Sequence, residues 1–347
     1  MKKIIFCCLL FLSLSLNAKV FERIVVFGDS LSDTGNIYKY MMHLLPKSPP
    51  YYKGHFSNGP MWTEGLFQHF MSSTDQERAH NFAVGGAAAV IDLGNTLPFS
   101  LATEVKDYLY LHQDRRKDVT LFLLWIGGNN YINYPGHVEQ KTEKTVAGIQ
   151  RNIEKLIQHG AEIFFIPNLP DLGGIPRANQ STHKAAELTA LSNAHNKKLK
   201  DMITQMRKVH PNVQFIDFDI KSIWDDLISN PASHGITNTT DACYKGSIIF
   251  MSPEPSDQDL RAYLIQDNEN KGVMLSTQKL DLILNTPTLR EAAKTGMLLS
   301  KNHIYDSLDC AGYVFWDDIH PTTYVHQKIS QYAIQAIEGS GLQFKKH

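Results

Sequence analysis

Ser30 lies in a segment whose residues are suited to nucleophilic chemistry. The apolar run Val25 to Phe27 leads directly into Gly28-Asp29-Ser30, which places a serine hydroxyl on a sharp turn after a buried strand. A serine hydroxyl is a poor nucleophile at neutral pH unless a base accepts its proton as it attacks. The segment therefore predicts a nucleophile if a base lies nearby. Taken alone, it fits equally a turn whose Ser or Asp caps a helix.

A base and an acid to orient it occur together near the other end of the chain. His320 follows Asp317 by three residues, and Pro321 turns the backbone away from helix just past the histidine. This spacing lets a carboxylate reach the Nδ1 proton of the imidazole and leaves Nε2 to face the serine. We expect Asp317 to orient His320 and His320 to act as the base. Asp318 competes for the orienting role, since only one of two adjacent carboxylates can face the ring.

Three N–H donors could bind the oxyanion of a tetrahedral intermediate, and each follows a predicted strand. They are the backbone N–H of Ser30, the backbone N–H of Gly86 and the side-chain amide of Asn129. Ligands of an open parallel sheet bind beyond the carboxyl ends of its strands, so we expect these donors to converge. Such donors usually make the largest single contribution to acyl transfer. Each feature also has a purely structural explanation. Gly85-Gly86 could allow a helix to pack closely on a strand, and Asn129 could cap a helix.

The elements that must position these residues are short apolar runs alternating with longer helical patterns. This alternation predicts a parallel sheet covered by helices on both faces. The five expected strands are 24–27, a short one ending at 81–83, 120–126, 162–166 and 213–218. The clearest expected helices are 138–158, 182–206 and 324–337.

The first 18 residues have the pattern of a secretory signal peptide: two lysines, a short apolar run and then Ala18. The apolar run is shorter than the ~20 residues that a membrane-spanning helix needs. Cleavage after Ala18 would leave only two cysteines, Cys243 and Cys310, and an even pair in an exported protein suggests a disulfide. We therefore expect a secreted or periplasmic protein.

Residues 19–347 are expected to form a single domain, with an insertion at about 235–310. The stretch from Gly235 to Asp309 is polar, weakly periodic and lies mostly between the two cysteines. One hypothesis is that this insertion covers the acyl-binding cleft until it moves or is cut.

Composition and motifs argue against several other classes of protein. The chain carries 34 basic and 35 acidic residues and has no basic run interleaved with aromatics, which argues against a nucleic-acid partner. It has no His-Glu-x-x-His or comparable set for a metal, and neither of the usual glycine-rich loops for a dinucleotide or a nucleotide phosphate. We expect no metal and no cofactor. No second apolar stretch reaches membrane-spanning length, so contact with lipid should be peripheral.

Taken together, four segments resemble, in order, the conserved blocks of the GDSL or SGNH hydrolases. The blocks are Phe27 to Asn36, Asn81 to Ala87, Gly127 to Asn129 and Asp317 to Thr322, and they span nearly all of the expected mature chain. The family fold is a three-layer α/β/α sandwich with a flavodoxin-like five-stranded parallel sheet. The resemblance implies a catalytic triad of Ser30, Asp317 and His320, with Asp317 favoured over Asp318, and an oxyanion hole of Ser30, Gly86 and Asn129. The chain departs from the family pattern at Asn130, where the family most often has Asp. We expect this difference to alter the orientation of Asn129 or the response of the activity to pH.

Further segments narrow the resemblance to exported bacterial lysophospholipases A, phospholipases A and glycerophospholipid:cholesterol acyltransferases. They are His55 to Glu64, Pro167 to Gly173 and Thr237 to Cys243. This resemblance implies a serine esterase that acts on phospholipids or lysophospholipids and passes the acyl group to water, to a sterol or to another alcohol. Two alternatives stay open: an esterase of acetylated carbohydrate, and a catalytically inactive protein that binds lipid or glycan.

Overall fold

The computed structural model describes most of the chain after residue 18. The residues expected as a signal peptide lie outside the described part, as do 244–254 and 303–308 of the expected insertion. The described residues are 19–41, 43, 45–71, 76–91, 99–113, 115–132, 135–243, 255–302 and 309–346.

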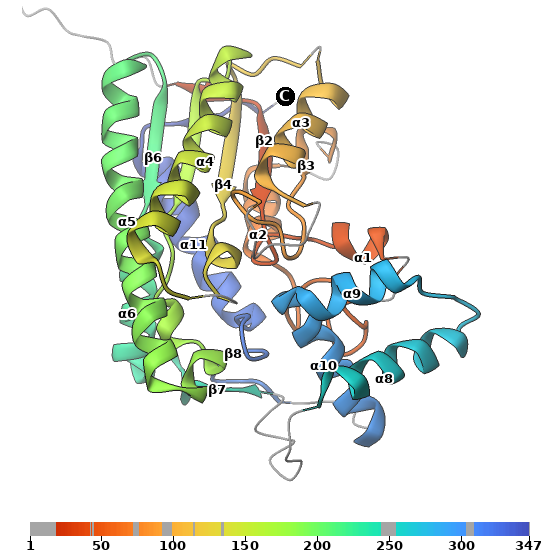
Figure 1. The fold of residues 1–347 in the computed structure, drawn as a ribbon. Helices are drawn as coiled ribbons and strands as arrows, with labels where there is room; N and C mark the ends of the chain where they lie inside the picture. Colours follow the sequence, from red (N-terminus) through yellow and green to blue (C-terminus); the bar gives the residue numbers. More distant parts are fainter. Residues whose placement is uncertain are drawn as a thin grey trace, which may run out of the picture.

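A five-stranded parallel sheet forms the centre of the molecule (Figure 1). Its strand order is β3-β2-β4-β5-β6, and all four neighbouring pairs are parallel. This is the flavodoxin-like order, so the predicted fold is confirmed. Each strand lies within two residues of its expected position: β2 (Arg23–Gly28), β3 (Ala79–Asn81), β4 (Thr120–Trp125), β5 (Ile163–Pro167) and β6 (Gln214–Phe218).

Side chains of the central strands alternate between two apolar cores because the sheet is buried on both faces. Ile24 and Val26 of β2 face one core, whereas Val25 and Phe27 face the other. The first core is covered by α2 (Trp62–Phe70), α6 (Ile220–Ser229) and α11 (Thr323–Gly339). The second is covered by α3 (Leu101–Leu111), α4 (Val138–Gln158) and the later part of α5 (Thr182–Val209).

Two small parallel pairs that the sequence pattern did not predict flank the main sheet. β1 (Val20–Phe21) pairs with β9 (Gln343–Phe344), near the two ends of the described chain. β7 (Asn238–Ala242) pairs with β8 (Tyr313–Phe315). The second pair brings the two ends of the expected insertion together, and β8 leads directly into the segment that carries Asp317 and His320.

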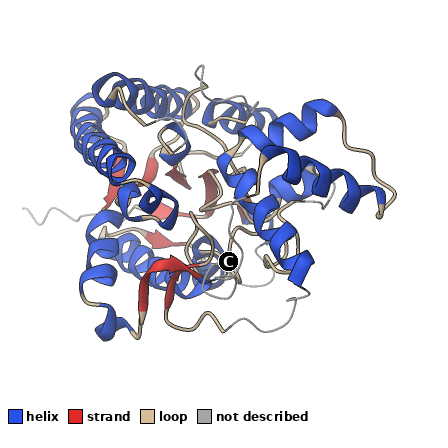
Figure 2. Ribbon diagram, turned by 60° about the horizontal axis from the view of Figure 1, so that its bottom comes forward, coloured by secondary structure: helices blue, strands red, loops and turns tan. Residues whose placement is uncertain are grey.

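The region expected to be a weakly periodic insertion contains three helices, so that expectation was incomplete. They are α8 (Asp257–Glu269), α9 (Thr277–Asn285) and α10 (Pro287–Asn302), which lie together to one side of the sheet (Figures 1 and 2). Ser256 and Ser276 cap α8 and α9, a start signal that was present in the sequence. Buried residues of these helices, among them Leu264, Ile283 and Leu289, share an apolar core with α1 (Asn36–Tyr40) and with Tyr51, Phe56 and Trp316.

The predicted disulfide is present at the base of these helices. Cys243 and Cys310 are bonded, with their Cα atoms 5.6 Å apart, and both lie in the apolar core of the inserted helices. The bond closes a loop of 67 residues. In the chain-entropy account, a loop of this length restricts the unfolded chain by about 4 kcal/mol.

We predict that the double variant Cys243→Ser/Cys310→Ser loses about 2–4 kcal/mol of unfolding free energy, because its unfolded chain regains the freedom that the bond removes. Urea denaturation of the purified oxidised protein and of the double variant measures the difference. The two single variants control for a reactive free thiol. Equal urea midpoints for the oxidised protein and the double variant would contradict the prediction.

Candidate active site

The turn after β2 holds Ser30 in a fixed and almost fully buried position. Gly28 donates its backbone N–H to Oε2 of Glu104 at 2.9 Å, and the Asp29 carboxylate accepts the N–H of Leu31 at 3.0 Å. A Cβ on Gly28 would lie 2.5 Å from the carbonyl oxygen of Trp125, so only glycine fits where β2 passes β4. The sharp turn predicted from the sequence is therefore enforced by the neighbouring strand.

The segment after β8 brings His320 and Asp317 to this serine. Nε2 of His320 lies 2.9 Å from Oγ of Ser30, and Nδ1 lies 2.7 Å from Oδ2 of Asp317. The Asp317 carboxylate also accepts the backbone N–H of His320 and the hydroxyl of Tyr51, both at 2.7 Å. Burial favours the neutral acid, but the adjacent His320 and these hydrogen bonds outweigh it and hold the pKa of Asp317 below its ordinary value.

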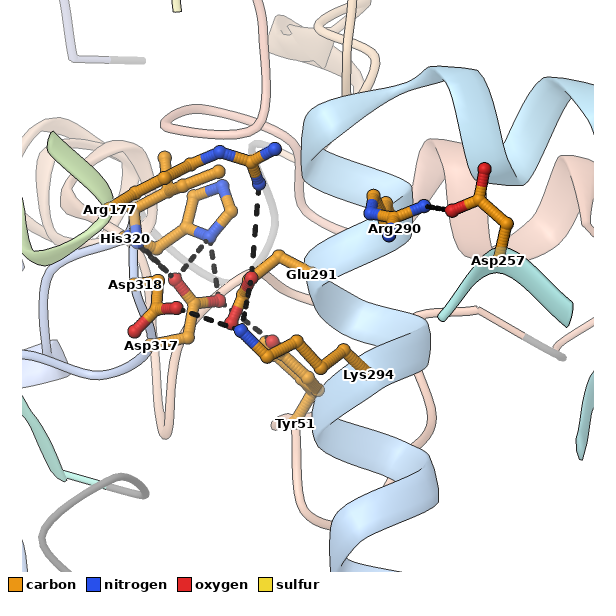
Figure 3. A network of polar contacts seen from close by, with 10 residues as sticks. Tyr51, Arg177, Asp257, Arg290, Glu291, Lys294, Asp317, Asp318 and His320 are labelled. Atoms are coloured by element: carbon orange, nitrogen blue, oxygen red, sulfur yellow. Dashed lines mark hydrogen bonds and ion pairs between the residues drawn. The ribbon is translucent and has the colours of Figure 1, made fainter. Parts of the chain in front are cut away.

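Asp318 does not reach the imidazole, although it is the neighbour of Asp317. Its Oδ2 accepts a hydrogen bond from Nζ of Lys294 at 3.1 Å, so the two carboxylates point in different directions (Figure 3). The structure thus brings together Ser30, His320 and Asp317, and it places Asp318 in a separate ion pair.

The three expected oxyanion donors lie on the turns after β2, β3 and β4. Gly86 has φ +82°, a left-handed conformation that glycine adopts without strain. The side-chain amide of Asn129 donates to the carbonyl oxygen of Ala87 at 3.0 Å, which links the second and third turns. Within the described part of the chain, no hydrogen-bond acceptor is found for the backbone N–H of Ser30 or Gly86.

Buried carboxylates brace the turns that carry these donors. The Asp33 carboxylate accepts the backbone N–H groups of Gly35, Asn36 and Ile37 from its own turn, and also that of Gly85 at 2.7 Å. It therefore ties the serine turn to the glycine turn. Burial raises the pKa of Asp33 to about 6 despite these hydrogen bonds.

An apolar pocket opens beside Ser30 and Asn129. It is lined mainly by large apolar side chains from β4, from the turn that follows β4, from residues 169–175, from α6 and from the segment after β8: Trp125, Ile132, Leu169, Leu172, Ile175, Trp224 and Ile319. Neither Gly86 nor any described residue of α8, α9 or α10 belongs to this lining. The hypothesis that the insertion covers the cleft thus finds no contact here among the residues that the structure describes.

Sequence reasoning missed several residues that build the site. Tyr51 contacts Asp317, and Glu104 contacts Gly28 of the serine turn, each from a distant part of the chain, and no local pattern indicates either contact. The pocket residues Leu169 and Leu172 belong to the segment Pro167 to Gly173, which resembles a family segment but does not by itself predict a place beside Ser30. Apolar residues that follow β5 lie at the same edge of the sheet as Ser30, and this position could have indicated that they line the pocket.

Among the residues that the structure describes, no group of three or more His, Cys, Asp or Glu side chains could hold a metal ion. No helix in that same part of the chain is long and apolar enough to span a membrane.

Comparisons with known proteins identify the family and several relatives of this chain. Residues 24–333 match the family described as GDSL-like Lipase/Acylhydrolase. The chain is 33% identical to a phosphatidylcholine-sterol acyltransferase of Aeromonas hydrophila over the full length of both proteins. It is 26% identical to the thermolabile hemolysin of Vibrio parahaemolyticus, over 91% of this chain and 63% of that protein.

A solved structure, the carbohydrate acetylesterase Est24 of Sinorhizobium meliloti, aligns with a TM-score of 0.38 at 12% identity. The alignment covers 56% of this chain and 83% of that one. Family assignment rests instead on the match over residues 24–333 and on the full-length relative. With its parallel sheet and the residues gathered around Ser30, the chain belongs to the GDSL-like lipase/acylhydrolase family.

Proposed function

We propose that this protein is an exported serine esterase that cleaves acyl esters of phospholipids or lysophospholipids. The observation that carries the proposal is the continuous hydrogen-bonded chain from Asp317 through His320 to Ser30, which opens onto an apolar pocket. Membership of the family supports the more general assignment of the chain as a hydrolase or acyltransferase.

The proposed reaction is a double displacement. Nε2 of His320 accepts the Ser30 proton as Oγ attacks the ester carbonyl, while Asp317 holds the imidazole in the required tautomer. The N–H groups of Ser30 and Gly86 and the Asn129 amide bind the oxyanion. Collapse expels the alcohol with the proton from His320 and leaves an acyl-enzyme. Water or another alcohol then attacks the acyl-enzyme, with His320 again acting as base.

Two observations support a lipid as the acyl donor. The pocket beside Ser30 is walled by tryptophan, leucine and isoleucine side chains, which suit an aliphatic chain better than a sugar. The full-length relative is named a phosphatidylcholine-sterol acyltransferase, which supports a phospholipid donor and makes a sterol a candidate acceptor. Export rests on the pattern of the first 18 residues, and contact with lipid would be peripheral.

Ser30→Ala is expected to abolish both hydrolysis and acyl transfer, by about 10³-fold or more, because both pass through the same acyl-enzyme. The measurement is release of free fatty acid and formation of acylated sterol from phosphatidylcholine–cholesterol vesicles and from lysophosphatidylcholine. Ser229→Ala, at an exposed serine of α6, is the matched control. Retained activity in Ser30→Ala, or no labelling of wild-type Ser30 by a fluorophosphonate, would overturn the triad.

A comparison of acyl donors separates the lipid esterase from the carbohydrate acetylesterase. We expect lysophosphatidylcholine with a long acyl chain to be cleaved with at least tenfold higher kcat/KM than acetylated xylan or acetylated glucose, since the pocket gains apolar contacts with a chain but not with an acetyl group. Faster turnover of the sugar acetates would favour the alternative function.

The side chain of Asn130 is hydrogen-bonded to the chain that follows Ala87. Its Oδ1 accepts the N–H of Ala89 and its Nδ2 donates to the carbonyl oxygen of Val90, each at 2.9 Å. The amide thereby holds the chain two residues beyond Ala87, whose carbonyl oxygen orients Asn129. A carboxylate at 130 would keep the acceptor but place a second oxygen against the Val90 carbonyl.

Asn130→Asp is therefore expected to lower both activity and stability, with a cost of about 1–3 kcal/mol for the lost donor at a buried position. The loss of activity and stability relative to wild type should increase from pH 5 to pH 8. Burial raises the pKa of the new acid, and only its protonated form can donate a hydrogen bond to the Val90 carbonyl oxygen. Melting temperature and fatty-acid release at both pH values measure it. Asn193→Asp, on the exposed face of α5, is the control, and a rise in activity of Asn130→Asp would refute this account.

A further inference from the structure

A buried ion network joins the inserted helices to the segment that carries the triad. Glu291 and Lys294 of α10 are only 4% and 6% exposed and point toward Asp318 (Figure 3). Nζ of Lys294 lies 3.1 Å from Oδ2 of Asp318 and 3.6 Å from Oε2 of Glu291. Arg177, from the short helix η4 (Pro176–Gln180), approaches Glu291 at 3.8 Å. The shortest ion pair of the network therefore links α10 to the immediate neighbour of Asp317.

Asp318 is held through its backbone as well as its side chain. Its carbonyl oxygen accepts the backbone N–H of Arg177 at 2.9 Å, while its carboxylate accepts from Lys294. An aspartate only 1% exposed needs such partners, since a buried charge without compensation costs several kcal/mol. The Lys294 pair therefore fixes which way the Asp318 side chain points, and with it the turn from Asp317 to His320.

The same helices support Asp317 from its other side. Tyr51 donates its hydroxyl to Oδ2 of Asp317, and its ring packs against Trp316 with centroids 5.9 Å apart. Both aromatic residues belong to the apolar core formed with Leu289 and Ala293 of α10. The helix α10 thus supports Asp317 through packing and Asp318 through charge.

We propose that Lys294 is a positioning residue for the triad: by pairing with Asp318 it holds the Asp317–His320 turn in register with Ser30, so that α10 is a required part of the active site. The inference rests on the triad role given to these residues under the proposed function. It predicts effects on the catalytic rate and on its pH dependence, which a lysine that only stabilised the inserted helices would not have.

Charge balance around His320 gives the direction of the pH effect. The groups that face this region are Asp317, Asp318 and Tyr51, Asp29 on the serine turn, His55, His326 of α11, and the network members Arg177, Glu291 and Lys294. Loss of the Lys294 cation leaves Asp318 as an excess negative charge, which favours the protonated imidazole of His320. Loss of the Asp318 anion leaves an excess positive charge and has the opposite effect.

The decisive experiment compares Lys294→Met, Lys294→Arg, Asp318→Asn and the neutral double variant Lys294→Met/Asp318→Asn. The probe substrates are p-nitrophenyl butyrate and lysophosphatidylcholine, and rates are expressed per serine titrated by a fluorophosphonate. Arg290→Gln is the matched control, because Arg290 lies on the same helix but pairs with the exposed Asp257 of α8 (Figure 3).

We expect Lys294→Met to lower kcat at least tenfold with KM within twofold, and to move the acidic limb of the kcat/KM profile upward by about half a pH unit or more. Asp318→Asn should move the acidic limb to lower pH. Lys294→Arg should keep most of the wild-type kcat, and the double variant should have a kcat between those of Lys294→Met and wild type. Arg290→Gln should stay within twofold of wild type.

An unchanged kcat per titrated serine and an unchanged pH profile in Lys294→Met would overturn the proposal, as would an equal loss in Arg290→Gln. If Lys294→Met does not fold, two other results still decide the matter: the unchanged pH profile expected for the charge-preserving Lys294→Arg and the downward shift expected for Asp318→Asn. A wild-type enzyme that neither reacts with fluorophosphonate nor turns over either ester would refute the proposed function instead, whatever the variants do.

Discussion

The buried carboxylate of Asp317 is the group on which the rest of the site depends. A negative charge with 1% of its residue surface exposed is stable only if donors surround it, and Asp317 receives them from its own turn, from the imidazole of His320 and from Tyr51. Each donor is itself held in place: the turn by Lys294 and Arg177 through Asp318, and Tyr51 by the core of the inserted helices. Satisfying this one anion therefore fixes the orientation of the imidazole toward Ser30.

Features governed by local rules could be predicted from the sequence. The three central strands β2, β4 and β5 are nearly continuous apolar runs because both faces of a parallel sheet are buried there, which is why the sequence predicts them to within two residues. The turn at Gly28 to Ser30 and the short spacing from Asp317 to His320 are local as well. That Ser30 and Asn129 line one pocket follows from the convergence of strand ends at one sheet edge, whereas His320 comes from the segment after β8, outside the main sheet.

What could not be predicted depends on contacts between distant parts of the chain. Tyr51 meets Asp317 across 266 residues, and nothing around a tyrosine in a proline-rich loop indicates such a partner. Lys294 and Glu291 look in sequence like the polar face of an exposed helix, yet they are buried because α10 packs against the catalytic turn. The inserted helices themselves were missed because their apolar residues are spaced between many polar ones, although serine caps marked two of their starts.

The nucleophile and its base are separated by 290 residues along the chain. Ser30 follows one of the first strands to be synthesised, whereas His320 arrives just before the last helix, so a growing polypeptide carries the serine before the imidazole that contacts it. Closing so long a loop carries an entropic cost, which the packing of the segment after β8 has to offset. The pairing of this serine with this imidazole is therefore possible only once the chain has been made through residue 320.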